Sequence, residues 1–222
     1  MMRLVYCLSM IFCLAHSVQA GPWLREQGSS FTSVSVTGNF ALDTTSQTFI
    51  EYGFTDHTTL IANVTLRRPR FDLEGGAATV SFRHAISVPE GPSKWAYELG
   101  VGASWTGTEV SPHLRTGLSW GRGMELSGTS GWMTVEGELI WDLLYGLHVA
   151  KIDTTAGLNL TDRTSAMLQI YTGHTALTST ATIAPSLVFT PKNGAFRIQI
   201  GTESLLGDFS NSAVKIGLWR TF

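Results

Sequence analysis

Hydrophobic and polar residues alternate one for one along most of the chain. The clearest stretch runs from Trp95 to Trp105, where the odd positions are mostly large and apolar and the even positions are Ala, Glu, Gly and Ser. A β-strand sends successive side chains to opposite faces, so this pattern indicates a strand with one apolar and one polar face. The same pattern recurs at 80–87, 113–120, 133–141, 196–203 and 214–221. Helical spacing is rare, which favours an all-β fold.

Turn-forming residues separate these stretches. One set of turns falls at 55–57, 89–92, 121–131, 161–163 and 191–194. A second set falls between them, at 42–46, 69–76, 106–109, 142–146, 174–179 and 207–212. Together they predict about twelve antiparallel strands, each of about 9–11 residues if the strands cross a bilayer. The phase is ambiguous in 147–160, and Pro185 predicts a β-bulge in 180–189 because proline cannot donate a ladder hydrogen bond.

The first twenty residues have the pattern of a secretory signal peptide. Arg3 precedes an apolar run from Leu4 to Ala15, and the segment ends Val18-Gln19-Ala20, with short side chains where a signal peptidase needs them. We expect cleavage after Ala20; the alternative is an N-terminal anchor. Residues 21–30 then form a periplasmic N-terminal segment, and residues 31–222 form the β-barrel. Both cysteines lie inside the signal peptide, so no disulfide is expected in the mature chain.

Composition supports an all-β protein with few surface charges. Charged residues make up 14% of the chain and aromatic residues 10%, and there are 23 glycines. The net charge of −2 argues against a nucleic-acid partner, because phosphate binding needs a basic surface. No apolar run after residue 20 reaches the roughly 18 residues of a membrane helix. If the mature chain crosses a membrane, it does so with strands.

Alternation alone does not say whether the apolar face points into a soluble, lipocalin-like barrel or out into a membrane. Three features favour the membrane. The polar face is rich in Gly, Ser, Thr and Asn with few lysines, a poor coat for a soluble protein. The chain closes on Phe222, in phase with Leu218, Ile216 and Val214, as in the terminal strand read by the outer-membrane assembly machinery. Arg220 departs from that signal, which usually has an aromatic or apolar residue at this position. Finally, aromatic residues at strand ends are typical of interfacial girdles: Tyr52, Phe54, Trp95, Trp105, Trp120, Trp132, Trp141 and Trp219.

These features predict a transmembrane, antiparallel, up-and-down β-barrel of about twelve strands in the outer membrane of a Gram-negative cell. The expected partners are outer-membrane lipid and lipopolysaccharide, with Phe222 as the signal for the assembly machinery. The oligomeric state stays open.

Two hairpins and the start of the mature chain carry a family resemblance. Tyr52–Leu60 and Leu158–Arg163 resemble the Gly/Leu-Thr-Asp-Arg hairpins of small proteobacterial barrels, and Gly21-Pro22-Trp23 to Phe31 resembles the mature start of an uncharacterised outer-membrane family. Members of that family are likened to transporters found near genes of the phenol-degradation meta-pathway. The resemblance implies transport and names no ligand.

No catalytic or cofactor motif stands out after residue 20. The His-x-Ser pair of outer-membrane lipid-modifying enzymes is absent there, and His84 and Ser87 fall on opposite strand faces. Five scattered histidines without cysteine give no zinc spacing, and no glycine-rich turn leads into a helix. We therefore expect no enzyme activity, no metal and no cofactor.

Charged residues gather in the polar phase of successive strands. Two interpretations remain: a salt-bridge network that fills a narrow lumen, or the lining of a pore of weak ion selectivity. The residues are Glu51, Arg83, Glu98, Arg115, Glu136, Glu138, Lys151, Asp153, Arg197, Glu203 and Lys215. The favoured function is a passive channel or transporter for small or apolar molecules. The alternatives are a non-transporting structural or surface barrel and, less favoured, a lipid-modifying enzyme.

Overall fold

The computed structural model of the chain describes residues 21–86, 92–146, 148–192 and 194–222. The expected signal peptide and most of the turn expected at 89–92 lie outside the described residues. Within the described residues, no helix is long and apolar enough to cross a membrane.

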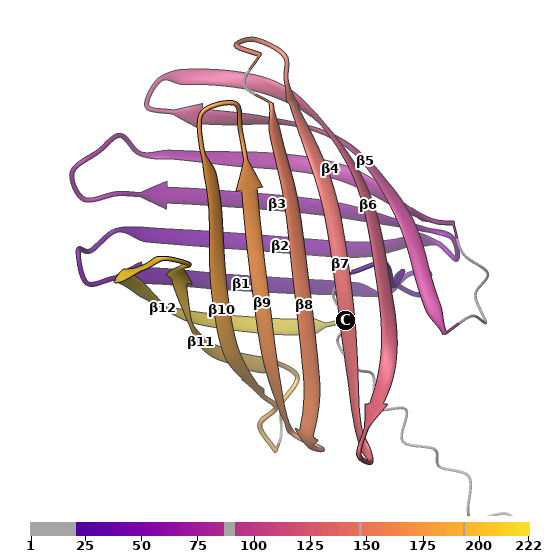
Figure 1. Cartoon of the computed structure of the whole chain (residues 1–222). Helices are drawn as coiled ribbons and strands as arrows, with labels where there is room; N and C mark the ends of the chain where they lie inside the picture. Colours follow the sequence, from indigo (N-terminus) through magenta and orange to yellow (C-terminus); the bar gives the residue numbers. More distant parts are fainter. Residues whose placement is uncertain (1–20, 87–91, 147, 193) are drawn as a thin grey trace, which may run out of the picture.

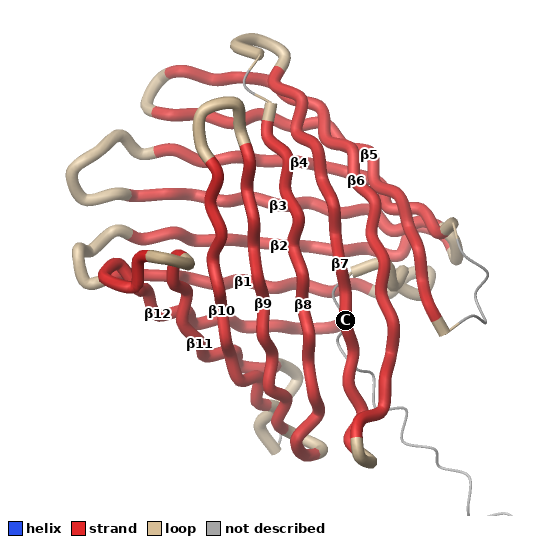
Figure 2. Tube along the Cα trace, viewed as in Figure 1, coloured by secondary structure: helices blue, strands red, loops and turns tan. Residues whose placement is uncertain are grey.

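The described residues form twelve antiparallel strands that close into a barrel, as the alternation predicts. Figure 2 shows strand along nearly the whole trace, with loops confined to the strand ends. The strands are β1 (Ser30–Asn39), β2 (Thr44–Thr55), β3 (Thr58–Arg68), β4 (Gly75–Ala85), β5 (Ser93–Thr106), β6 (Glu109–Leu126), β7 (Thr129–Asp142), β8 (Val149–Thr161), β9 (Thr164–His174), β10 (Ser179–Phe189), β11 (Arg197–Leu205) and β12 (Asp208–Thr221).

Each strand pairs with its neighbours in sequence, and β1 closes the barrel by pairing with β12, from Phe31 opposite Thr221 to Asn39 opposite Ala213. We call the end where β1 begins and β12 ends the terminal rim, and the opposite end the far rim. At the terminal rim, Ser30 and Phe222 exchange backbone hydrogen bonds of 3.2 and 2.9 Å. In Figure 1, β1–β4 run at a steep angle across β7–β10, as expected for strands tilted against a barrel axis.

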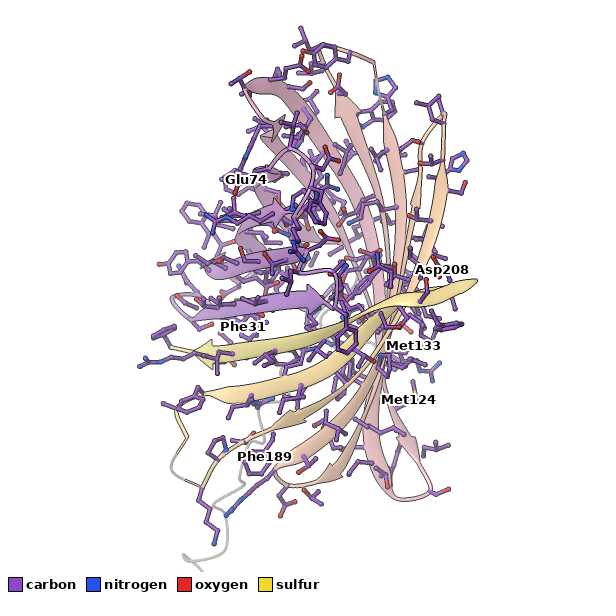
Figure 3. All side chains as sticks on the ribbon, turned by 90° about the vertical axis from the view of Figure 1, so that its left-hand side faces the viewer. Phe31, Glu74, Met124, Met133, Phe189 and Asp208 are labelled. Carbon is purple, nitrogen blue, oxygen red and sulfur yellow. The ribbon has the colours of Figure 1, made fainter. Side chains whose placement is uncertain are left out.

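The apolar phase of the strands points outward. Leu99 is 54% exposed on the outer wall, whereas Gln199 is 3% exposed and points into the lumen. Figure 3 shows side chains on both sides of the barrel wall. An apolar pocket of about 760 Å³ is lined by residues of β6–β12, with Leu158, Leu168 and Leu187 at its outward-pointing positions. An apolar outer wall around a polar lumen is the reverse of a soluble barrel and suits contact with lipid.

Two local expectations were wrong. Pro185 causes no β-bulge: its pairing with Leu168 is continuous with the rest of the β9–β10 ladder, and the register to β11 is the same on both sides of it. The missing N–H instead leaves a gap in the β10–β11 ladder at residues 184 and 185. Strand length was the second: the strands run from 9 residues in β11 to 18 in β6, so the longest exceed the expected 9–11 residues. A hairpin can extend past the membrane without breaking its ladder, so bilayer thickness sets only a lower limit.

Candidate functional site

The barrel encloses a chamber of about 220 Å³ lined by inward-pointing side chains. Its walls differ in chemistry. Most of its charged residues come from β2, β4 and β6–β8, whereas the aromatic rings of β1, β2, β9 and β12 are those of Phe31, Phe49, Tyr171 and Trp219. The chamber therefore offers both ion pairs and apolar surface to anything that enters it.

The charged wall is a continuous chain of ion pairs, and its first pairs within the strands join β2, β4 and β5. Arg83 on β4 is 3% exposed and lies between two acids: its Nη1 donates to Glu51 at 2.8 Å, and its Nη2 donates to Glu98 at 3.2 Å. Ser81 Oγ donates a further hydrogen bond of 2.6 Å to Glu98. Each buried charge here has partners of opposite sign, which offsets the cost of removing it from water.

The chain of ion pairs continues across β6, β7 and β8. Arg115 lies 3.2 Å from Glu98 and also pairs with Glu138. Lys151 then lies 3.6 Å from Glu138 and 3.3 Å from Asp153. Together with Arg25, described next, these residues make up what we call the lumenal ladder. It consists of Arg25, Glu51, Arg83, Glu98, Arg115, Glu138, Lys151 and Asp153.

The first member of the ladder comes from the N-terminal segment, residues 21–29, which lies in the lumen near the terminal rim. Arg25 Nη2 is 2.6 Å from Glu51, and the backbone N–H of Arg25 donates to Thr59 Oγ1 at 2.9 Å. The Gly21 carbonyl accepts a hydrogen bond of 2.7 Å from Arg83. Gly53 on β2 exchanges backbone hydrogen bonds with this segment, and a Cβ there would come 2.0 Å from the Glu26 carbonyl oxygen. Only glycine permits so close an approach.

Sequence reasoning missed this placement of the N-terminal segment. The sequence predicts residues 21–30 as a periplasmic N-terminal segment; in the structure β1 begins at Ser30, and Gly21 and Arg25 contact the inner wall of the barrel. Pro22 is buried, and Trp23 packs with the inner cluster described below. The signal in the sequence for a segment inside the barrel is the presence of Pro22, Trp23 and Arg25 directly after the expected cleavage point.

An apolar cluster lies inside the barrel beside the ladder. Trp132, Met167 and Val188 are buried together, and Trp23 and Trp219 pack against them. The prediction that Trp132 and Trp219 belong to an interfacial girdle is therefore wrong. Both lie near strand ends, but Trp132 shares the inward phase of Thr134, and Trp219 shares that of Lys215. Proximity to a strand end does not set the face; phase does.

The remaining sequence candidates lie outside the ladder. Glu203 and Lys215 form a separate pair of 2.8 Å between β11 and β12. Arg197 is the first residue of β11, opposite Trp219 in the β11–β12 register. Glu136 lines the chamber. Phe222 is exposed at the terminal rim, where the Arg220 guanidinium stacks on its ring at 4.3 Å. This cation–π contact stabilises Arg220 at a position where the usual terminal signal has an aromatic or apolar residue.

The histidines are spread over the barrel. His113 hydrogen-bonds with Thr79 at 3.1 Å in the lumen, His84 with Thr58 at 2.9 Å, and His174 with Ser179 at 2.6 Å across the exposed β9–β10 turn. Among the described residues, no group of three or more His, Cys, Asp or Glu could hold a metal ion. The arrangement of these side chains fits either a lumen through which small molecules pass or a lumen filled by its own side chains.

Several solved structures share this fold. The KdgM porin aligns with a TM-score of 0.62 and 7% identity, over 86% of this chain and 99% of that chain. The NanC porin aligns with a TM-score of 0.59 and 10% identity, over 86% of this chain and 98% of that chain. The COG4313 outer membrane channel from Pseudomonas putida F1 aligns with a TM-score of 0.56 and 10% identity, over 92% and 100%.

At these identities the likeness shows the fold alone, that of outer-membrane porins and channels. No protein-family model matches the chain, and no curated protein matches it significantly.

Proposed function

We propose that the chain is a passive channel of the Gram-negative outer membrane for small or apolar molecules, with its terminal rim towards the periplasm. The observation that carries the proposal is a closed barrel with an apolar outer wall around a polar chamber of about 220 Å³. The fold shared with outer-membrane porins and channels supports it. Both ends of an even-stranded barrel lie at one rim, and in bacterial barrels that rim faces the periplasm.

The lining of the chamber bears on what passes. The lumenal ladder contains four cations and four anions, so it gives little reason to prefer either sign of ion. Phe31, Phe49 and Trp219 add apolar surface to the same chamber. These features favour small neutral or apolar molecules. The resemblance to transporters of the phenol-degradation meta-pathway is consistent with that class.

One observation favours the second candidate, a barrel with a structural or surface role that transports nothing. The N-terminal segment lies inside the lumen, where Arg25 pairs with Glu51 and the Gly21 carbonyl accepts from Arg83. A channel must then open by moving that segment, or conduct only through the space beside it.

Planar-bilayer conductance separates the two candidates. We would compare the mature chain with a variant lacking residues 21–27, and use Glu26→Gln, at an exposed position of the same segment, as the matched control. A channel predicts larger single-channel steps for the truncated barrel and unchanged steps for the control. If neither wild type nor the truncated barrel conducts or admits small solutes into vesicles, the channel is excluded and the structural role remains.

A further inference from the structure

Gly21 lies deep in the lumen, against the inner face of β7. The residue is buried, and its carbonyl accepts a hydrogen bond of 2.7 Å from Arg83 Nη1. A Cβ built on Gly21 would come 2.5 Å from Thr134 Cγ2. The first residue after the expected cleavage point is therefore packed within the barrel.

An acid with no hydrogen bond or ion pair among the described residues faces the same space. Glu136 is two residues beyond Thr134 on the inner face of β7 and lines the chamber that Gly21 also lines. Within the described part of the chain, Glu136 takes part in no hydrogen bond or ion pair, whereas Glu138 beside it has two cations. Across the β7–β8 ladder it faces another acid, Asp153, whose Oδ1 is buried without a hydrogen-bond partner.

Charge balance shows what is missing there. The lumenal ladder is neutral on its own, so Glu136 is an acid in addition to those that the cations of the ladder balance. An unpaired carboxylate in a narrow lumen is costly, and it sits opposite a second carboxylate. Arg83 is close, but its Nη atoms are already engaged by Gly21, Glu51 and Glu98. Within the described residues, no ion pair joins a cation to Glu136.

We propose that removal of the signal peptide supplies this cation as the α-ammonium of Gly21, which pairs with Glu136. The inference rests on the expected cleavage after Ala20. Hydrolysis adds water across the Ala20–Gly21 peptide bond, leaving a carboxylate on Ala20 and an ammonium group on Gly21. Before cleavage the Gly21 nitrogen is a neutral amide that cannot balance a carboxylate. Afterwards it is a cation with three donors in the chamber that Glu136 also lines.

The consequence is a maturation step that locks the N-terminal segment in place. Before cleavage the segment is held by the Arg25–Glu51 pair, the hydrogen bond from Arg83 to the Gly21 carbonyl, the packing of Trp23 and its backbone hydrogen bonds. In the mature chain, the ammonium group adds an anchor deep in the lumen. The barrel interior thereby distinguishes the cleaved from the uncleaved protein.

Chemical protection of the Gly21 amine tests the pairing. The mature protein, folded in detergent micelles, is treated with cyanate, which carbamylates only the unprotonated α-amine, and the N-terminal peptide is then quantified by mass spectrometry. We expect the amine of the folded wild type to react about tenfold more slowly than that of Glu136→Gln. The variant loses the charge-assisted hydrogen bond that keeps the amine protonated. Glu203→Gln, which removes a lumenal acid paired with Lys215, is the matched control and should stay protected.

A second variant keeps the test independent of the effect of Glu136→Gln on folding. Two serines inserted between Ala20 and Gly21 move the amine away from Glu136 and should abolish its protection, while heat-modifiable migration in gels reports the folded barrel. Equal rates in wild type and Glu136→Gln would overturn the pairing, as would a protected amine in the insertion variant or a mature chain starting elsewhere. None of these readouts depends on conductance, so failure here is distinct from failure of the channel.

Discussion

The indole ring of Trp132 on β7 lies directly over Gly157, its register partner on β8. A Cβ at Gly157 would come 2.2 Å from Cζ2 of Trp132, closer than two carbon atoms can approach. Trp132 is 4% exposed and packs with Met167 and Val188 inside the barrel. The glycine therefore provides the space that allows a large aromatic side chain to lie flat against the inner wall.

Gly157→Ala should force Trp132 out of this position. We expect a loss of about 1–3 kcal/mol in unfolding free energy, the usual cost of overpacking, measured by urea unfolding in micelles. Gly123→Ala is the matched control, because a Cβ at Gly123 meets nothing within 4 Å. Combining Gly157→Ala with Trp132→Leu should recover part of the loss. Equal stability of wild type and Gly157→Ala would contradict the packing described.

Arg83→Met should destabilise the barrel more than loss of any peripheral cation. It leaves Glu51 and Glu98 buried with one cation each and removes the donor to the Gly21 carbonyl. Breaking a buried ion pair costs about 3–5 kcal/mol, and the remaining cations place this loss near the lower value. Lys215→Met, which breaks a more exposed pair, should cost less. A double-mutant cycle with Glu51→Gln measures the coupling. Additive losses would show that the two residues do not interact.

The apolar phase of the strands should contact lipid. Ile200 is 59% exposed on the outer wall, and Gln47 lines the inner chamber. The chain has no cysteine after residue 20, so single cysteines can be placed without background. Ile200→Cys should react with a lipid-soluble thiol reagent, and Gln47→Cys with a small water-soluble one. Ile200→Arg should cost about 2–4 kcal/mol near the bilayer midplane. Water-soluble labelling at Ile200 in the folded protein would contradict the membrane assignment.

Phe222→Asp should impair assembly and leave exported protein to be degraded. Phe222 is 62% exposed, so its side chain adds little to the packing of the finished barrel, and the expected effect comes from recognition during assembly. Phe222→Tyr, which keeps the ring, should assemble normally. The measurement is the yield of heat-modifiable protein in outer-membrane fractions. Normal yield from Phe222→Asp would mean that the terminal residue is not read.

The sequence predicts the strands of this barrel, and the face on which each side chain lies, better than it predicts what fills the lumen. Alternation assigns the outward phase of Leu99 and Ile200 and the inward phase of Arg83 and Glu98, because side chains of a strand must alternate. Nothing comparable governs a segment without regular structure. The path of residues 21–29 into the lumen depends on contacts such as Arg25 with Glu51, between residues distant in sequence.

The apolar cluster shows the same limit. Positions near strand ends predict Trp132 and Trp219 in the interfacial girdle, but the strand phase of both residues puts them inside the barrel. The lumen has room for them because glycines such as Gly157 leave space against the wall, and that depends on which residues are register partners across neighbouring strands. Pairing register of this kind is not visible from one strand alone.

The pairing of β1 with β12 also constrains the order in which the strands of the barrel can assemble. Val34 and Leu218 are register partners there, although ten strands lie between β1 and β12 in the described chain. No earlier part of the chain can cap the open edge of β1, whose unpaired backbone groups must wait for the last strand. Closure of the barrel therefore has to wait for β12, whereas the strands from β2 to β11 can pair with their sequence neighbours beforehand.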